Sequence, residues 1–296
     1  MKIKESKGDR IFGLIINTIL FICVLLCLYP LYLVVINSFS DPGQVAQGNV
    51  YVVPKGFSLN AYVKLFEDGD ILRGYWNSII YTIFGTALSM ALTIPAAYAL
   101  SKEKLYGGGL IMRLVVFTMY FSGGVVPTYM VVRGLGMLNT GWAIIFSGTV
   151  SATNMIIART FFATSIPKEL EESAEIDGCS PLQTFLKVVL PLSKAMLSVI
   201  LLYYAVARWN NYTSALYYLP MAPEKYPLQM VLRERLIQVK MYGEVAGNSE
   251  MAAYYADLQN QIKYSVIVVA SLPLLIAYPF VQKFFEKGVM LGSVKG

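Results

Sequence analysis

Carboxylates form the densest group of side chains in this sequence that could do chemistry. Five of them fall between residues 169 and 177, namely Glu169, Glu171, Glu172, Glu175 and Asp177. In a membrane-embedded transferase, Glu175 and Asp177 could hold a metal ion. The sequence contains no histidine, which is the commonest general base and a frequent metal ligand, and this stretch contains no Asp-x-x-Asp pair. We therefore expect no catalytic residue, no metal site and no enzyme activity, and a transferase stays the alternative.

A second candidate group is the run Arg208, Trp209, Asn210, Asn211 and Tyr212 near the end of an apolar stretch. Its aromatic rings could stack on the faces of a pyranose, and its amides could bind sugar hydroxyls. The same residue types are also typical of a membrane interface, where Arg extends its head to water and aromatic rings anchor a helix end. Both interpretations stay open.

A third candidate is the segment from Phe121 to Tyr129, which contains Gly123, Gly124 and Pro127 within an otherwise apolar run. Such residues interrupt a helix, and a break at membrane depth is tolerated only against protein or beside a water-filled cavity. Gly123, Gly124 and Tyr129 are therefore candidates for lining a substrate path. The alternative is a close helix crossing at small residues.

The acidic residues must be positioned by a short helix. Pro167 suits the first turn of a helix, where its missing N–H costs nothing. The carboxylates that follow lie near the positive end of the helix dipole. Gly178 is placed to end this helix in the left-handed conformation.

A second short helix is predicted directly afterwards. Ser180 is its N-cap, Pro181 is its first residue, and Gln183 completes a capping box. Pro191 marks the point where this helix ends or kinks. The stretch 167–191 is thus expected to form two short helices joined by a glycine elbow.

The composition places this block inside a membrane protein. The chain of 296 residues is 56% hydrophobic and only 14% charged, whereas soluble domains are about 25% charged. Six stretches are long enough to cross about 30 Å of hydrocarbon. They are predicted at about residues 11–36, 76–100, 114–132, 141–162, 192–212 and 264–282.

The basic residues predict how these spans are oriented. Lys and Arg gather before the first span, after the second and after the sixth, and such positions are cytoplasmic. Both termini and the stretch 167–191 are therefore expected inside, and residues 217–263 outside. The net charge of +6 reflects this topology, so no nucleic-acid partner is expected.

The stretch 167–191 resembles the EAA loop of ABC importer permeases. That pattern is Glu-Ala-Ala, three residues, Gly, nine residues, Ile, any residue and Leu-Pro. Here the matching positions are Glu172, Ser173, Ala174, Gly178, Val188, Leu190 and Pro191, with Ser for the first Ala and Val for Ile. The segment 121–129 is similar to the FSGG-x-x-PTY segment of carbohydrate importer permeases, and residues 54–62 fit their P-x-x-F-S-L-x-x-Y run.

This resemblance implies a single type I importer permease domain over residues 1–296, with multiple spans in a bacterial plasma membrane. It implies that the stretch 167–191 docks on an ATPase through Glu172, Ser173, Ala174, Asp177, Gly178, Leu190 and Pro191. The sequence contains no Gly-x-x-x-x-Gly-Lys-Ser/Thr pattern. ATP and Mg²⁺ are therefore expected on the partner ATPase, and no cofactor is expected on this chain.

The implied assembly contains a second permease, expected to be a different chain, two ATPase subunits and an extracellular solute-binding protein. The implied solute is a sugar, in particular an oligosaccharide or a polysaccharide fragment. A permease for another solute, such as an amino acid or a polyamine, stays the alternative. A surface loop without a coupling role is the alternative for the stretch 167–191. Neither the identity of the sugar nor a homodimeric permease pair is decided by the sequence.

Overall fold

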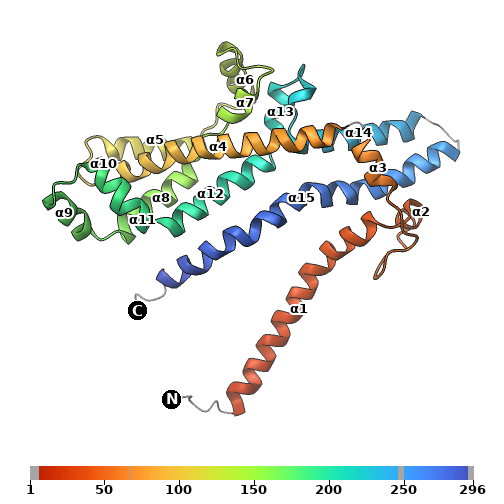
Figure 1. Cartoon of the computed structure of the whole chain (residues 1–296), viewed down its shortest axis with the longest axis horizontal. Coiled ribbons are helices and arrows are strands. Elements are labelled where there is room, and N and C mark those ends of the chain that lie inside the picture. Colours follow the sequence, from red (N-terminus) through yellow and green to blue (C-terminus); the bar gives the residue numbers. More distant parts are fainter. Residues whose placement is uncertain (1–6, 68, 246–249, 293–296) are drawn as a thin grey trace. The chain divides into compact units, whose positions relative to one another are not determined.

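The computed structural model describes residues 7–67, 69–245 and 250–292, and helices make up most of them (Figure 1). The β-pairing among these residues is one isolated antiparallel bridge between Ser40 and Phe57. The prediction of an all-α protein is therefore confirmed. The chain forms two compact units, with residues 1–68 and 232–272 in unit 1 and residues 69–231 and 273–296 in unit 2. The single domain over residues 1–296 stays a prediction.

Unit 1 contains a long apolar helix and a compact loop region. Its elements are α1 (Lys7–Ser38), α2 (Pro42–Ala46), α3 (Asn60–Phe66), most of α14 (Leu228–Val245) and the first half of α15 (Glu250–Gly292). The apolar side chains of α1 are exposed along most of its length, as lipid contact requires, and burial begins only near Ile36. There Ile36 packs with Val45 and Val50 in a small core.

A buried amide holds the loop region of unit 1 together. Gln261 on α15 is fully buried, and its Nε2 lies 2.7 Å from the carbonyl oxygen of Ser40 and 3.2 Å from that of Ser58. It also lies 3.3 Å from the carbonyl oxygen of Ser38. A loop without strands leaves carbonyl groups unpaired, and the amide supplies their donor. The Asp41 side chain caps α2 by accepting hydrogen bonds from two backbone amides.

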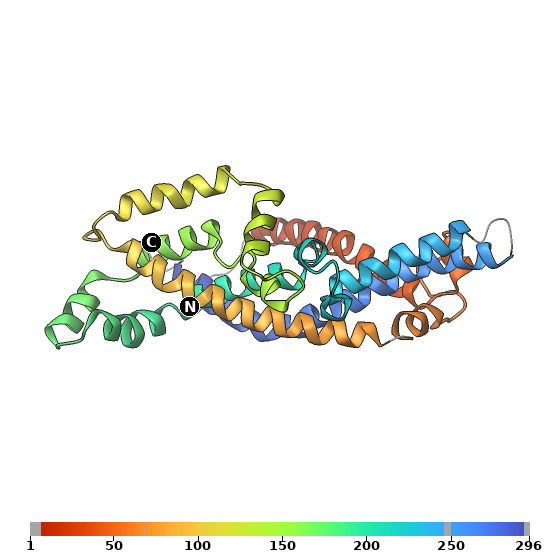
Figure 2. The same ribbon diagram turned by 90° about the horizontal axis from the view of Figure 1, so that it is seen from above.

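Unit 2 is built around α4 (Asp70–Ser101). Helices α8 (Ala152–Ser165) and α12 (Lys194–Trp209) lie beside it (Figures 1 and 2). Their buried apolar side chains form the core, which includes Ile94, Ala97, Phe162 and Ile200. Within this packing, the Thr93 and Tyr204 hydroxyls lie 2.7 Å apart. Such interhelical hydrogen bonds satisfy polar groups at membrane depth.

The remaining elements of unit 2 are shorter. They are α5 (Gly108–Tyr120), α6 (Val125–Gly134), α7 (Gly141–Phe146), α9 (Lys168–Ile176), α10 (Pro181–Thr184), the π-helical turn η1 (Phe185–Val189), α11 (Leu190–Leu192), α13 (Thr213–Tyr218) and the 3-10 turn η2 (Pro223–Lys225).

The predicted spans correspond to helices, but two of them are interrupted. Helix α1 covers span 11–36, α4 covers span 76–100, and α15 covers span 264–282. Span 114–132 is divided between α5 and α6, which are bent by 116°. Span 141–162 is also divided, because α7 ends at Phe146 and α8 begins at Ala152. Gly148 between them has a φ of +64°, which a regular helix does not accommodate.

Length and apolar character single out two helices among the described residues that could each cross a membrane, Arg10–Ser38 and Asp70–Ser101. The number rises to four if each of two bent helix pairs counts as one span. Six spans and cytoplasmic termini therefore stay predictions.

Candidate functional site

The acidic helix α9 has the ends that its sequence predicts. Its N-cap is Pro167, one residue earlier than the first-turn position expected, and the helix begins at Lys168. At the other end, Gly178 has a φ of +79°. The Gly178 amide donates to the Glu175 carbonyl at 3.0 Å, and the Cys179 amide donates to the Ala174 carbonyl at 2.9 Å. This pair of bonds is a Schellman motif, which confirms the predicted glycine elbow.

The second short helix is capped as predicted and then distorted. The Ser180 amide donates to the Gln183 side-chain oxygen at 2.9 Å, and the Gln183 amide donates to the Ser180 hydroxyl at 3.3 Å, so the capping box is confirmed. Helix α10 continues through η1 into α11, where Pro191 has no N–H to donate. The segment 181–192 then meets α12 at a bend of 84°. The kink expected at Pro191 is therefore confirmed.

Two ion pairs connect α9 to the end of α4. The Lys102 ammonium group pairs with the Glu171 carboxylate, and it also lies 4.2 Å from the centroid of the Tyr98 ring. Only 35% of the Lys102 side chain and 22% of the Glu171 side chain are exposed. The Lys168 ammonium lies 2.8 Å from the Glu103 carboxylate, and both of these side chains are exposed.

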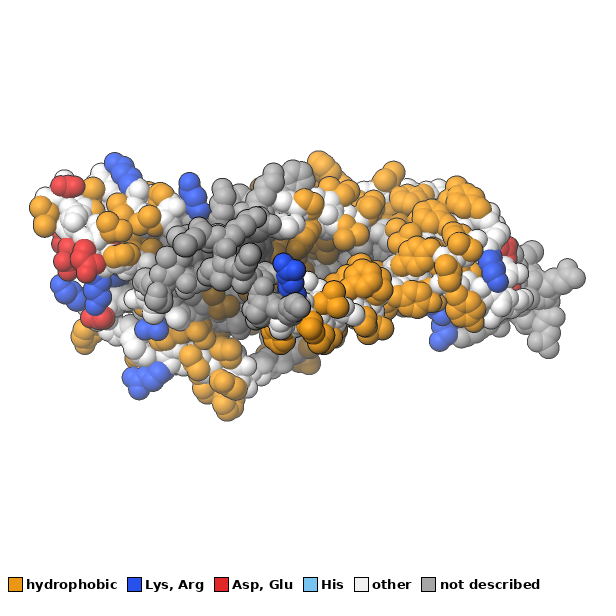
Figure 3. Space-filling model, turned by 90° about the horizontal axis from the view of Figure 1, so that it is seen from below, with side chains coloured by type: hydrophobic (Ala, Val, Ile, Leu, Met, Phe, Trp, Pro, Cys, Tyr) orange, Lys and Arg blue, Asp and Glu red, His pale blue; other side chains and the backbone are white. Residues whose placement is uncertain are grey.

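The pair of Lys168 and Glu103 is an ordinary surface interaction. The Lys168 ammonium beside Glu103 holds the pKa of that carboxyl below its usual value, and Glu103 in turn raises the pKa of Lys168. Figure 3 shows acidic and basic side chains gathered at the end of unit 2 that carries α9. No motif in the sequence marks Lys102, Glu103, Lys168 and Glu171 as a site. The one available signal was that both segments were expected on the cytoplasmic side.

The side chains of α9 divide between an exposed face and a buried one. Glu172, Ser173 and Asp177 are exposed, as is Ile176 with 86% of its surface accessible. Ala174 is buried against its own chain, because it lies on the face that packs inward. Leu190 packs against the core of unit 2, and Pro191 is exposed. The exposed face thus offers carboxylates and an apolar side chain to a partner.

The break after α5 lies where the glycines predict it. Helix α5 ends at Tyr120, and Gly124 has a φ of +82° before α6 begins. The Gly124 amide donates to the Ser122 hydroxyl at 3.2 Å, and the Thr128 hydroxyl donates to the Gly124 carbonyl at 2.8 Å. A Cβ atom added at Gly123 would meet only the Pro127 ring of α6, at 3.7 Å, and one added at Gly124 would meet nothing within 4 Å. Tyr129 is half-buried on α6.

The run from Arg208 to Tyr212 does not act as one cluster. Arg208 points inward, where its Nη1 donates to the Ile144 carbonyl at 3.2 Å and its Nη2 donates to the Ser89 hydroxyl at 3.0 Å. Trp209 is buried, with its ring centroid 6.2 Å from that of Tyr75. The Asn211 side-chain oxygen accepts a hydrogen bond from the Ser214 backbone amide at 3.1 Å, at the start of α13. Asn210 and Tyr212 are exposed.

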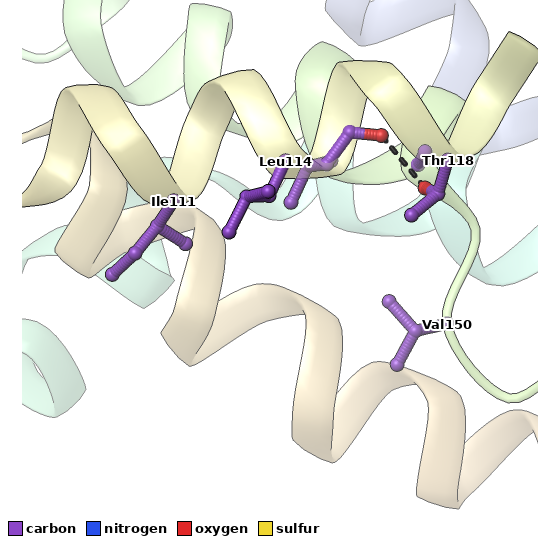
Figure 4. A pocket seen from close by; sticks show the side chains of 6 residues that line it. Ile111, Leu114, Thr118 and Val150 are labelled. Carbon is purple, nitrogen blue, oxygen red and sulfur yellow. Dashed lines mark hydrogen bonds between the residues drawn. The ribbon is translucent and has the colours of Figure 1, made fainter. Parts of the chain in front are cut away.

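A hollow of 470 Å³ lies between α5 and the segment that joins α7 to α8 (Figure 4). Ile111, Leu114 and Thr118 line it from α5, and Val150 faces them. The Thr118 hydroxyl donates to the Val115 carbonyl at 2.7 Å and is therefore occupied. The lining has no charged side chain, so this hollow suits an apolar chain better than a sugar.

Apolar helices that carry a capped acidic block define the class of protein, a membrane transport component. The chain belongs to the family described as "Binding-protein-dependent transport system inner membrane component", which it matches over residues 69–291. The resemblance to importer permeases is thereby confirmed. The family consists of transport components, so a transferase is not supported.

The similar proteins include a named permease of a transport system. The chain is 43% identical, over 97% of its length and 99% of the relative, to the "Polygalacturonan/rhamnogalacturonan transport system permease protein YtcP" of Bacillus subtilis (strain 168). It is 40% identical to "Protein LplC" of the same organism, over 99% of this chain and 97% of the relative. A solved structure is 34% identical with a TM-score of 0.79, and the match covers 96% of this chain and 100% of the other. It is the "Crystal structure of a bacterial ABC transporter involved in the import of the acidic polysaccharide alginate".

Proposed function

We propose that this chain is a permease subunit of an ATP-driven importer and forms half of the translocation path for an oligosaccharide or a polysaccharide fragment. The observation that carries the proposal is the block from α9 to α11, with its Schellman elbow, its capping box and the spacing of an EAA loop. The named substrates of the relatives support a carbohydrate. The chain would cross a bacterial plasma membrane six times, with both termini in the cytoplasm.

In this proposal, α9 is the coupling helix that docks on a separate ATPase, which binds ATP and Mg²⁺. The exposed carboxylates of Glu172 and Asp177 would bind basic groups of that partner through charge-assisted hydrogen bonds. Ala174 and Leu190 keep the block packed on its own chain, and Gly178 sets the angle between its helices. Movement of α9 would reach α4 through the pair of Lys102 and Glu171.

The remaining partners follow from the architecture of such importers. A second permease would complete the path, two ATPases would hold the two coupling helices, and an external binding protein would deliver the sugar. Two segments of unit 2 are proposed to line the path. They are the interrupted backbone at Gly123 and Gly124 and the polar end of α12. In the assembly, polar groups at membrane depth would have to face the second permease or a water-filled cavity.

The test is sugar-stimulated ATP hydrolysis by the complex reconstituted with its binding protein. Gly178→Pro and Glu172→Lys are expected to abolish the stimulation while membrane insertion persists. Lys104→Glu, a charge change at an exposed position after α4, is the matched control and should hydrolyse normally. Normal transport by both variants would overturn the coupling role of α9. Stimulation by an amino acid or a polyamine instead of an oligosaccharide would overturn the solute class.

A further inference from the structure

A charged side chain lies in the interior of unit 2 at the level of the middle of α4. Arg208 extends from α12 so that its guanidinium rests on Gly85, where a Cβ atom would sit only 2.4 Å from Nη1. Gly85 is about 23 Å along the helix axis from either end of α4, at 1.5 Å per residue. Glycine at this position lets the guanidinium rest directly on α4, and any side chain there would displace it.

The guanidinium is only partly satisfied by the protein. Arginine has five N–H donors, and the two printed bonds of Arg208 go to the Ser89 hydroxyl and the Ile144 carbonyl. Its Nε is buried and has no hydrogen-bond partner. No carboxylate among the described residues pairs with Arg208. A half-buried cation with an unsatisfied N–H and no carboxylate partner is costly, and an anion that bound it would remove that cost.

Two hydroxyl groups beside Gly85 are also unsatisfied. The Oγ1 atoms of Thr82 and Thr86 are buried and have no partner. Both residues belong to α4, and they lie within one turn of Gly85. A cation with free N–H donors, next to hydroxyls that can donate or accept, matches a ligand that carries both carboxylate and hydroxyl groups.

We propose that Arg208 recognises the carboxylate of the sugar in transit, and that the importer carries uronate-containing, acidic oligosaccharides. This inference rests on the proposed function of sugar import and names its substrate class. The planar fork of the guanidinium binds a carboxylate through two parallel hydrogen bonds, which an ammonium group cannot do. Because Nε is buried in this arrangement, recognition requires α12 to shift against α4 during the transport cycle.

The test compares two probes that differ only in charge, an oligogalacturonate and the same oligosaccharide after reduction of its carboxyl groups. Uptake of each is measured in proteoliposomes that contain the complete complex and its binding protein. Arg208→Gln is expected to lower uptake of the oligogalacturonate at least about tenfold more than it lowers uptake of the neutral probe. Arg208→Lys keeps the charge but not the planar fork. Its uptake of the oligogalacturonate should fall between that of the native complex and that of Arg208→Gln.

Arg159→Gln is the matched control, because the Arg159 Nε also donates to a carbonyl of α4, that of Leu100 at 3.0 Å. It should leave the ratio of the two uptake rates unchanged. If Arg208→Gln does not assemble, Gly85→Ala tests the same site, since it displaces the guanidinium and keeps the charge.

The outcomes separate the inference from the proposed function. An equal loss of both probes in the Arg208 variants would show that Arg208 only holds the helices together, and would overturn the inference. Uptake of the neutral probe alone by the native complex would overturn the substrate class and leave sugar import intact. Uptake of neither probe by a complex that couples ATP hydrolysis to a different kind of solute would overturn both.

Discussion

Reversing the charge of Glu171 should weaken the connection between α9 and α4. The Glu171 carboxylate and the Lys102 ammonium are each more than half buried, so they are screened less by water than a surface pair. Exposed ion pairs contribute about 0.2–1 kcal/mol, and this partly buried pair is placed at the upper end of that range. Replacing this attraction with repulsion in Glu171→Lys should cost about 2 kcal/mol, a factor of about 30 in the population of the connected arrangement.

The measurement is the number of sugar molecules imported per ATP hydrolysed in proteoliposomes. Glu171→Lys should lower this ratio, because ATPase movements would reach α4 less often. The double variant Lys102→Glu with Glu171→Lys should restore most of it, since the swapped charges attract again. Lys168→Glu is the control: it places like charges at the exposed pair with Glu103, where solvent screens them, and should have little effect.

Two results would refute this reasoning. One is an equal loss of coupling in Glu171→Lys and in Lys168→Glu, which would mean that burial of the pair is irrelevant. The other is a double variant as poorly coupled as the single one, which would mean that Glu171 acts through a contact other than Lys102.

Three further predictions concern the elbow, the loop region of unit 1 and pH. Gly178→Ala should destabilise the elbow by about 1–2 kcal/mol through the left-handed backbone alone, because nothing lies within 4 Å of the added Cβ. Coupling of ATP hydrolysis to transport should therefore fall less than in Gly178→Pro. An equal loss of coupling in the two variants would contradict this account. Gln261→Leu removes the donor shared by three carbonyl groups and should lower the stability by about 1–3 kcal/mol, measured as a lower melting temperature in detergent. Gln259→Leu, at a half-exposed position, is the control and should leave the melting temperature unchanged. The folded pKa of Glu103 lies below its ordinary value of 4.5, and that of Lys168 lies above 10.5. The contribution of this pair to the stability of the fold is therefore fully present above the ordinary pKa of Glu. It is lost as the pH falls through the lowered pKa of Glu103, and it is lost again only as the pH rises through the raised pKa of Lys168. Uptake by Glu103→Gln should consequently follow the same pH profile as the native complex between about pH 6 and about pH 8, and a divergence in that range would contradict this assignment.

Local patterns predicted the block from α9 to α11 well because its bonds join residues at most five positions apart. Ser180, Gln183 and Gly178 act on backbone groups in their own turn, so residue type and spacing are enough. The pair of Lys102 and Glu171 spans 69 positions, and no spacing rule reaches that far. Only the packing of α9 against the end of α4 brings these two side chains together.

The side chains of residues 208–212 lie in different surroundings for a geometric reason. Successive residues of a helix point about 100° apart, so a helix end sends neighbouring side chains to different surroundings. Arg208 and Trp209 therefore face the interior, whereas Asn210 is exposed. The interruption after Phe146 was missed because Gly148 stands alone, without the second glycine and the proline that mark the break near Gly124.

The exposure of α1 bears on how the protein is made. This helix obtains almost no contact from its own chain, so lipid alone can hold it as soon as it leaves the translocon. Helix α12 is different, because it carries Arg208 in its last turn, and a charged side chain in an isolated apolar helix is costly. Among the described residues, the Arg208 guanidinium donates to Ser89 and Ile144, which are synthesised earlier. Biogenesis should thus run in two stages, with α1 tethering the nascent chain to the bilayer until α12 can be inserted against helices that are already in place.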